Sequence, residues 1–283
     1  MRFWKFVGAA LLGGAGVGIQ AADRSADRTC DEFYARLPNV SWALCQSAQL
    51  QASPARSVRG RTLYVAEVKP ASSPSLRVLV LGGIHGDELS SASMALHWIR
   101  LAQSDPQHIH WRFLPATNPD GLFDRPARRM NAHGVDLNRN FPTPNWQHDA
   151  PYYWEVRTRK DPRRWPGPSP LSEPESRFIY DEIEAFRPDL VVSIHAPYGL
   201  LDFDGPHDPP ERLGRLYLDR VGVYPGSLGN FGGVQNGVPV VTIELPSAQL
   251  TPRNIEIERM WRDLRQWMGV KLARASNGSL APQ

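Results

Sequence analysis

His85 and Glu88 are the first residues in the chain whose types and spacing suggest metal chemistry. They flank Gly86 and Asp87, directly after an apolar run that ends in a glycine-rich turn. Because a helical turn takes about 3.6 residues, an imidazole and a carboxylate at this spacing can reach one point, and Gly86 leaves that point uncrowded. The spacing is weak evidence alone, since surface pairs also reach it by chance. Further ligands must therefore come from elsewhere in the chain.

Two more ionisable residues stand in equivalent places. His195 follows the apolar stretch 189–194, and Glu244 follows the apolar stretch 238–243. In open α/β sheets, sites form beyond the carboxyl ends of the strands, so we expect these side chains and His85 at one edge. A His/Glu/His set leaves one zinc position open for water, and a nearby glutamate suits a general base. The pattern predicts one zinc ion per chain.

The elements that must position these residues alternate between strands and helices. Several of the predicted strands are apolar throughout, which is typical of strands buried on both faces. The fold class is therefore α/β, with a mixed, mostly parallel central sheet and helices on both faces. A Pro-, Trp- and Arg-rich stretch at 141–170 is expected to form a long functional loop, and a capping box at 172–175 to begin a helix. Strands are predicted at 61–68, 76–81, 111–115, 189–194 and 238–243, and helices at 89–101, 172–186 and 252–268.

Further motifs follow one another in a fixed order. They are Asn118-Pro119-Asp120-Gly121, then Arg129, then the run Gly-Val-Asp-Leu-Asn-Arg-Asn-Phe at 134–141, then His195 and Glu244. With the His85–Glu88 pair, they strongly resemble the zinc carboxypeptidase family over roughly residues 61–267. The resemblance implies that family's fold and a metal-dependent hydrolase of peptide or amide bonds. It also implies that His85, Glu88 and His195 hold the zinc ion and that Glu244 is the base that activates water.

Three basic or amide side chains complete the roles that the resemblance implies. Arg129 would stabilise the oxyanion, while Asn138 and Arg139 would bind the carboxylate of the released residue. General chemistry agrees, because the planar fork of arginine suits a carboxylate and a fixed cation suits a developing negative charge. As an alternative, Arg129 belongs to a solvated basic cluster with Arg125 and Arg128.

Two further stretches, 166–175 and 224–229, match a subgroup of the family that acts on peptidoglycan peptides. The likeness implies peptidoglycan-derived peptides as substrates and cleavage of the amide between γ-D-glutamate and meso-diaminopimelate. The alternatives are a general zinc carboxypeptidase that releases C-terminal amino acids, an N-acyl amino acid deacylase of the aspartoacylase type, and a non-catalytic wall-binding protein. The motifs at 118–121 and 134–141 argue against the deacylase, and the complete metal set with Glu244 argues against the binding protein.

Net charge and the N-terminus bear on partners and location. The formal charge is +3, and no block of like charges marks a nucleic-acid-binding arm. Arg2 and Lys5 precede the apolar run 6–19, which is shorter than the roughly 20 residues that a membrane span needs. We therefore expect a signal peptide over 1–22, cleaved near Ala21 or Ala22, with an uncleaved anchor as the alternative. The mature protein is expected to be periplasmic or secreted, without a stable membrane span.

Four segments are expected along the chain. The signal peptide (1–22) is followed by an N-terminal extension (23–60), a zinc peptidase/amidase domain (61–272) and a flexible tail (273–283), and the Pro/Ser-rich stretch 53–59 is the candidate joint. Cys30 and Cys45, the only cysteines, both lie in the extension. In an oxidising compartment we expect them to form a disulfide that adds roughly 3 kcal/mol, although two free thiols are the alternative.

Overall fold

A seven-stranded mixed sheet forms the centre of the molecule. The structure, a computed structural model, describes residues 28–278, with side chains through residue 272. The strand order is β1-β2-β4-β3-β5-β9-β6. The strands β4, β3, β5 and β9 pair in parallel at the centre, while β1, β2 and β6 join by antiparallel pairing. The predicted fold class is confirmed. The bounds are Gln51–Arg56 (β1), Thr62–Val68 (β2), Leu76–Leu81 (β3), Ile109–Leu114 (β4), Leu190–His195 (β5), Leu200–Asp204 (β6) and Val240–Glu244 (β9).

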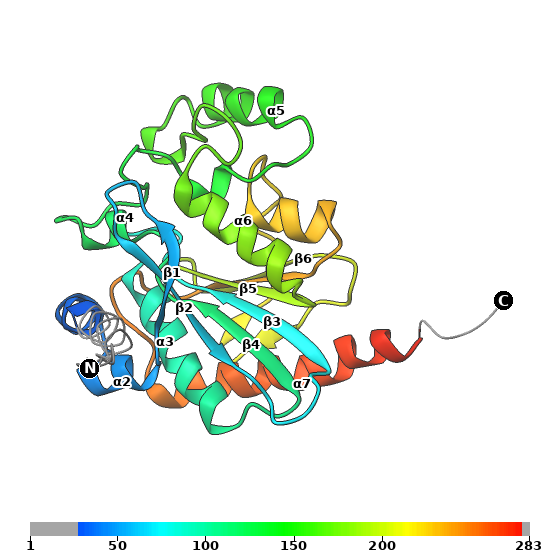
Figure 1. The fold of residues 1–283 in the computed structure, drawn as a ribbon. Helices are drawn as coiled ribbons and strands as arrows, with labels where there is room; N and C mark the ends of the chain where they lie inside the picture. The colour runs from blue at the N-terminus through cyan, green and yellow to red at the C-terminus, as the bar shows by residue number, and fades with distance from the viewer. Residues whose placement is uncertain (1–27, 279–283) are drawn as a thin grey trace, which may run out of the picture.

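Helices cover both faces of this sheet (Figure 1). The helices α3 (Leu89–Ser104) and α7 (Asn254–Gly278) lie on one face, and α6 (Pro174–Phe186) lies on the other. The short elements are α2 (Trp42–Ser47), α4 (Pro119–Phe123), α5 (Trp146–Tyr152), β7 (Arg212–Leu213), β8 (Leu216–Tyr217), the 3-10 turns η1 (Leu137–Arg139) and η3 (Pro162–Arg164), and the π-helical turns η2 (Tyr153–Arg157) and η4 (Asn230–Gln235).

The strand β3 shows why the central strands are apolar throughout. Its side chains alternate between two cores, so Val78 and Val80 pack with α3 and α7, whereas Leu79 and Leu81 pack with α6. Because successive residues of a strand point to opposite faces, burial on both faces removes the polar positions that a one-sided strand would keep. The same burial fixes the register of β3, β4, β5 and β9, whose carboxyl ends consequently meet at one edge of the sheet.

Two strands of the seven-stranded sheet lie where the sequence did not predict them. The stretch 53–59, interpreted as a joint, begins inside β1, which adds an antiparallel edge to the sheet. Pro54 is compatible with this place, since an edge strand does not need every N–H. The strand β6 was missed because Asp202 and Asp204 interrupt its apolar pattern. It pairs antiparallel with β9 at the opposite edge.

Two local predictions need correction. The stretch 141–170 is not one irregular loop, because it contains α5, η2 and η3. The capping box is also wrong, since α6 begins after Glu173 and no side chain caps its first turn. Ser172 Oγ instead donates to Glu173 Oε1 at 2.7 Å, and the Glu175 carboxylate accepts from Val58 N and Asn131 Nδ2. Those buried contacts take both carboxylates away from the helix terminus.

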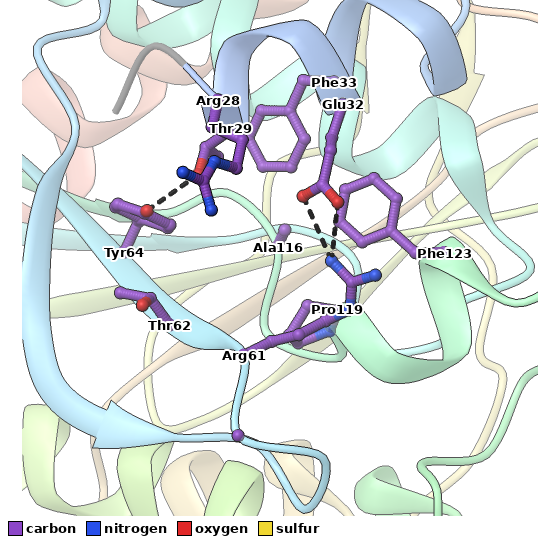
Figure 2. A pocket seen from close by; sticks show the side chains of 11 residues that line it. Arg28, Thr29, Glu32, Phe33, Arg61, Thr62, Tyr64, Ala116, Pro119 and Phe123 are labelled. Atoms are coloured by element: carbon purple, nitrogen blue, oxygen red, sulfur yellow. Dashed lines mark hydrogen bonds and ion pairs between the residues drawn. The ribbon is translucent and has the colours of Figure 1, made fainter. Parts of the chain in front are cut away.

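The first described part of the N-terminal extension, residues 28–48, packs onto the α3/α7 face of the sheet. Residues 28–36 are helical, and the predicted disulfide joins Cys30 to Cys45. Both sulfurs belong to the same core as α3 and α7. Glu32 accepts from Arg61 Nη1 at 3.1 Å, which links the extension to the residue just before β2 (Figure 2). In the described residues the extension therefore shares the core of the domain that follows it.

Some expectations fall outside this description. The predicted signal peptide and residues 279–283 lie outside the described residues. The helix α7 continues to Gly278, so it enters the stretch from 273 that was predicted as a tail. Within residues 28–278, none of the helices combines the length and the apolar character that a membrane crossing requires.

Candidate metal centre and catalytic cleft

The three predicted metal ligands converge at the carboxyl ends of the parallel strands. His85 follows β3, Glu88 immediately precedes α3, and His195 is the last residue of β5. All three side chains are buried, and their ligand atoms lie within 4.8 Å of one another. Gly86 is required at the turn, because a Cβ there would overlap the backbone of Gly121. Close contact between two backbones thus holds the His85–Glu88 turn in place.

The distances between the ligand atoms fit a tetrahedral ion. Glu88 Oε1 lies 2.8 Å from His85 Nδ1, and Glu88 Oε2 lies 3.1 Å from His195 Nδ1. The two Nδ1 atoms are 3.2 Å apart. Two nitrogens that each bind zinc at about 2.1 Å with tetrahedral angles lie roughly 3.4 Å apart, so little movement would seat the ion. Burial favours the neutral form of Glu88, but the two imidazoles hold the pKa of its carboxyl below the usual value.

The other ring nitrogen of each histidine, Nε2, also has a hydrogen-bond partner. Asp136 Oδ1 lies 3.1 Å from His85 Nε2, and Ser193 Oγ lies 2.9 Å from His195 Nε2. Partners of this kind fix the tautomer and the ring orientation of a histidine that binds metal through its other nitrogen. The structure therefore provides oriented Nδ1 donors, a carboxylate and supporting hydrogen bonds, which together suit zinc.

Asp136 also positions Arg129. The Arg129 guanidinium donates to Asp136 Oδ2 through Nε at 3.1 Å and Nη2 at 2.9 Å, while Nη1 points to the ligand set, 3.6 Å from Glu88 Oε1. Burial disfavours the ionised Asp136, yet Arg129 and His85 hold the pKa of its carboxyl well below the usual range. Arg129 is thus fixed beside the metal ligands and does not join a solvated cluster, whereas Arg128 pairs with Asp124 at the surface.

Asn138 and Arg139 lie farther along the same cleft. Asn138 Oδ1 accepts from the Leu228 N–H at 2.8 Å, which orients its amide. The Arg139 side chain stacks on the Tyr224 ring, 4.6 Å from its centroid, and Nη1 donates to the Asn138 carbonyl at 2.6 Å. Burial lowers the pKa of this guanidinium. Its Nε is buried and has no hydrogen-bond partner in the described part of the chain, which leaves one donor of this cation unsatisfied.

Glu244 ends β9 directly beside His195, its Cα partner in the β5–β9 register. Glu244 is 7% exposed, and its Oε2 has no hydrogen-bond partner among the described residues. Burial raises the pKa of this carboxyl, which is the shift expected of a residue that takes and returns a proton. The metal-ligand atoms do not include those of Glu244. The carboxylate is therefore near the ligand set without belonging to it.

These residues line one cavity of about 400 Å³. All seven side chains predicted from the sequence line it: His85, Glu88, Arg129, Asn138, Arg139, His195 and Glu244. It is distinct from a cavity of about 530 Å³ between the N-terminal extension and β2 (Figure 2). That second cavity is lined by residues such as Thr29, Tyr64 and Phe123, and none of the predicted site residues reaches it. The chemistry therefore belongs to the smaller cavity.

Comparison with known proteins decides the family. The family described as zinc carboxypeptidase matches residues 49–204. The chain belongs to the zinc carboxypeptidase family. Murein peptide amidase A of Vibrio campbellii is 35% identical over 207 residues, a match that covers 69% of this chain and 80% of that protein. Murein peptide amidase A of Escherichia coli K12 is 32% identical over 198 residues, covering 68% of this chain and 79% of that protein.

A solved structure agrees with this membership of the zinc carboxypeptidase family. Murein-tripeptide amidase from Escherichia coli O157 is 25% identical to this chain, with a TM-score of 0.54, and the match covers 75% of this chain and 89% of that one. The protein is thus a hydrolase of the metallocarboxypeptidase and amidase type. The resemblance inferred from the ordered motifs is confirmed.

Several residues that line the cavity or support its ligands were not found from the sequence. The role of Asp136 went unnoticed although it lies inside the 134–141 motif, because only folding shows that it contacts both His85 and Arg129. The stretch 141–170 supplies Arg164, and η4 is preceded by the glycine-rich segment that supplies Tyr224. The missed strand β6 contributes three lining residues, namely Leu200, Asp202 and Asp204. Its pattern of two aspartates on alternate positions was the available signal.

Proposed function

We propose that this chain is a zinc-dependent hydrolase of peptidoglycan-derived peptides that cleaves the amide between γ-D-glutamate and meso-diaminopimelate. The observation that carries the proposal is the convergence of His85, Glu88 and His195 on one point. Glu244, whose Oε2 has no hydrogen-bond partner among the described residues, lines the same cavity. Three protein ligands, an open position and an adjacent base are the parts that metal-assisted amide hydrolysis requires.

Each residue contributes a separate step to the reaction. His85, Glu88 and His195 would hold the zinc ion, which would supply a Lewis acid to polarise the scissile carbonyl and to make water more acidic. Glu244 takes a proton from the water whose oxygen attacks the carbonyl carbon. The same carboxyl then gives that proton to the amide nitrogen as the carbon–nitrogen bond breaks. One water is thus divided between a new carboxylic acid and a new amine, and Glu244 returns to its starting state.

The arginines hold the two negative charges of the reaction. Arg129 directs Nη1 towards the ligand set and stabilises the oxyanion that develops on the carbonyl. Asn138 and Arg139 bind the free carboxylate of the released residue, and the unpartnered Nε of Arg139 supports this role. Because Asp136 fixes Arg129 before the substrate arrives, the cation needs little rearrangement when negative charge develops.

The substrate class rests on similarity to the murein peptide amidases, which the chain matches over about two thirds of its length. In a tripeptide, the diaminopimelate that leaves carries its own free carboxylate, which suits the Asn138 and Arg139 pair. The same pair suits any C-terminal residue, so a general carboxypeptidase that releases C-terminal amino acids is the second candidate. The two functions differ in the bond that is cut.

Product analysis separates the two candidates. The zinc-loaded mature protein is incubated with L-Ala-γ-D-Glu-meso-diaminopimelate, with the tetrapeptide that adds D-Ala, and with an ordinary L-peptide, and the products are identified by mass spectrometry. The proposal predicts L-Ala-D-Glu from the first substrate. Release of only the C-terminal amino acid from the ordinary peptide would favour the second candidate and contradict the first.

Metal analysis tests the ligand assignment independently of the substrate. We expect one zinc per chain in the intact protein and none in His85→Ala or His195→Ala, with activity lost in both variants. Elemental analysis gives the stoichiometry, and circular dichroism checks that each variant is folded. Full zinc occupancy in either variant would rule out that residue as a ligand.

We also propose that the protein is exported to the periplasm or secreted. The charged and apolar segments within residues 1–22 support export, and so does the Cys30–Cys45 disulfide, because such bonds persist in oxidising compartments. Fractionation of expressing cells tests this, together with mass measurement of the purified N-terminus. Full-length protein recovered only from the cytoplasm would contradict it.

A further inference from the structure

The cavity has a wall that the proposed mechanism does not use. Leu200, Asp202 and Asp204 occupy alternate positions of β6 and line the cavity together with Thr242 and Glu244 of β9. The residues between them face away, and Phe203 packs against Trp267 in an edge-to-face contact. Two carboxylates thus project from one strand into the space where a substrate must bind.

The two aspartates lack a cationic partner. Neither forms an ion pair with any side chain in the part of the chain that the structure describes. Asp202 is 6% exposed; its Oδ1 accepts from the Phe203 N–H at 2.9 Å, and its carboxylate also accepts a backbone hydrogen bond from Val221. Asp204 lies against Gly229, where a Cβ would overlap Asp204 Oδ2, so the absence of a side chain leaves room for the carboxylate. Two buried or half-buried carboxylates without a cation are costly unless a ligand supplies the charge.

The electrostatic surroundings agree with this geometry. Burial raises the pKa of both carboxyls, and with the field of Asp202 it brings the pKa of Asp204 to about 6. Arg220 and Asp219, the other charged groups that act on Asp202, have opposite effects on it. Across the sheet, the register partner of Asp204 is Val240, which is uncharged. At neutral pH this wall is therefore negative, while Arg129, Arg139 and Arg164 bring positive charge to the same cavity.

Two buried atoms at the catalytic end show independently that the cavity is built for a ligand. Glu244 and Arg139 both line it and are 7% and 5% exposed, and Glu244 Oε2 and Arg139 Nε have no hydrogen-bond partner among the described residues. Buried polar groups are nearly always satisfied, so these atoms are expected to be paired when substrate binds. The aspartate wall is continuous with the same cavity.

The spacing along β6 defines which part of a substrate reaches the aspartates. Leu200 of β6 pairs with Glu244 of β9, and Asp202 pairs with Thr242. Asp202 is therefore displaced from Glu244 by two residues along the strand, which is the distance to the next side chain on the same face of the sheet. That distance is roughly 7 Å along a strand. The amino group at the end of a lysine or diaminopimelate side chain lies five bonds from the α-carbon, which is roughly 6 Å when extended. A released residue held at Glu244 would place that ammonium group beside Asp202.

We infer that Asp202 and Asp204 form a cation-binding subsite that selects substrates whose released residue carries a distal ammonium group. This inference rests on the proposed function, since it names the substrate feature that the same cleft recognises. Lysine and diaminopimelate both present the group. Norleucine lacks it, and so does 2-aminopimelate, which keeps the distal carboxylate of diaminopimelate and therefore isolates the ammonium as the one difference.

Hydrolysis of matched tripeptides tests the subsite. The series is L-Ala-γ-D-Glu-X, where X is meso-diaminopimelate, 2-aminopimelate, lysine or norleucine, and the measured quantity is the kcat/KM ratio within each pair. In the unmodified enzyme we expect the ammonium-bearing member to be favoured roughly ten- to a hundredfold, the range for a hydrogen bond between charged groups. Asp204→Asn and Asp202→Asn should each reduce that ratio about tenfold or more.

A matched control separates the subsite from overall charge. Asp208→Asn makes the same charge change at an exposed residue outside the cavity and should keep the wild-type ratio. If the buried Asp202→Asn variant does not fold, the half-exposed Asp204→Asn decides the question. Equal rates for both members of each pair in the unmodified enzyme, or an unchanged ratio in Asp204→Asn, would overturn the inference.

Direct binding keeps the inference testable even if no peptide is cut. Calorimetry with the zinc-loaded protein compares free meso-diaminopimelate with 2-aminopimelate. Selective binding of the ammonium-bearing ligand that Asp204→Asn abolishes would support the subsite although the proposed hydrolysis had failed. Hydrolysis of all four tripeptides without selectivity, and binding without selectivity, would leave the proposed function standing and remove the subsite.

Discussion

Replacing Glu244 by glutamine tests the mechanism most directly. The change keeps the side-chain shape and removes the basic carboxylate. Zinc should remain bound, because the converging ligand atoms belong to His85, Glu88 and His195 alone. Stability should change little, since Oε2 has no partner to lose among the described residues and burial already disfavours the charged form. A loss of activity can therefore be attributed to the missing base.

The size of the loss follows from the neighbours of Glu244. The next carboxylate on that face of β6, Asp202, pairs with Thr242 and lies roughly 7 Å along the strand, too far to replace the base. A positioned general base contributes roughly a hundred- to ten-thousandfold, which equals about 3–5.5 kcal/mol of transition-state stabilisation. Both proton transfers depend on this carboxyl, so we expect a kcat loss at or above the upper end of that range, with KM little changed.

The assay follows release of diaminopimelate from the tripeptide under single-turnover and steady-state conditions, with zinc measured in the same samples. Glu244→Asp is the matched control, because it restores a carboxylate one methylene short and should recover part of the activity. Near-normal turnover in Glu244→Gln would show that water is activated without this residue. Loss of zinc from the variant would instead make Glu244 a ligand, with Glu88 as the candidate base.

Three further predictions follow from the contacts described above. Asp136→Asn should weaken zinc binding about 10–100-fold in a competitive chelator titration, because the buried carboxylate orients a metal ligand; an unchanged affinity would mean that the contact is incidental. Replacing both Cys30 and Cys45 by serine should lower the free energy of unfolding by about 3 kcal/mol in a denaturant titration, as expected for a cross-link with a sequence separation of 15. Because the disulfide lies in the α3/α7 core and outside the catalytic cavity, kcat/KM should be retained, and a parallel loss of catalysis would contradict this separation. Finally, the preference for diaminopimelate over 2-aminopimelate should fall as pH drops from 7.5 through 6, since the pKa of Asp204 is raised to about 6 and its carboxylate loses charge below that value. The ratio within one enzyme cancels pH effects on the metal ligands, so a ratio that stays flat across this range would count against Asp204.

The sequence predicted the metal end of the site well for a physical reason. Strands buried on both faces are recognisable as apolar runs, and parallel pairing brings their carboxyl ends to one edge. His85, His195 and Glu244 each follow or end such a run, so their proximity could be inferred without coordinates. The ordered motifs then added Arg129, Asn138 and Arg139, which the fold brings to the same cavity.

The substrate end was much harder to predict. The strand β6 is short, and two of its five residues are aspartates, so neither length nor hydrophobicity identified it. Its pairing with β9, which the sequence does not reveal, turns alternate residues into a cavity wall. The role of Asp136 was equally hard to predict, because it depends on contacts with His85 and Arg129, which are 51 and 7 positions away in the chain. Long-range pairing, more than local propensity, decided both cases.

The arrangement of β6 and β9 suggests how catalysis and selectivity can vary separately. The metal ligands lie just after β3, just before α3 and at the end of β5, and Asp136 and Ser193 orient the two histidines. The aspartate wall lies on an edge strand whose only strand neighbour in the main sheet is β9. Substitutions at Asp202 or Asp204 therefore change a side chain in the cavity without disturbing the supports of the ligand set. The strand β9, which lies between β5 and β6, carries the base Glu244. Substrate preference can therefore change through β6 while the catalytic residues stay the same.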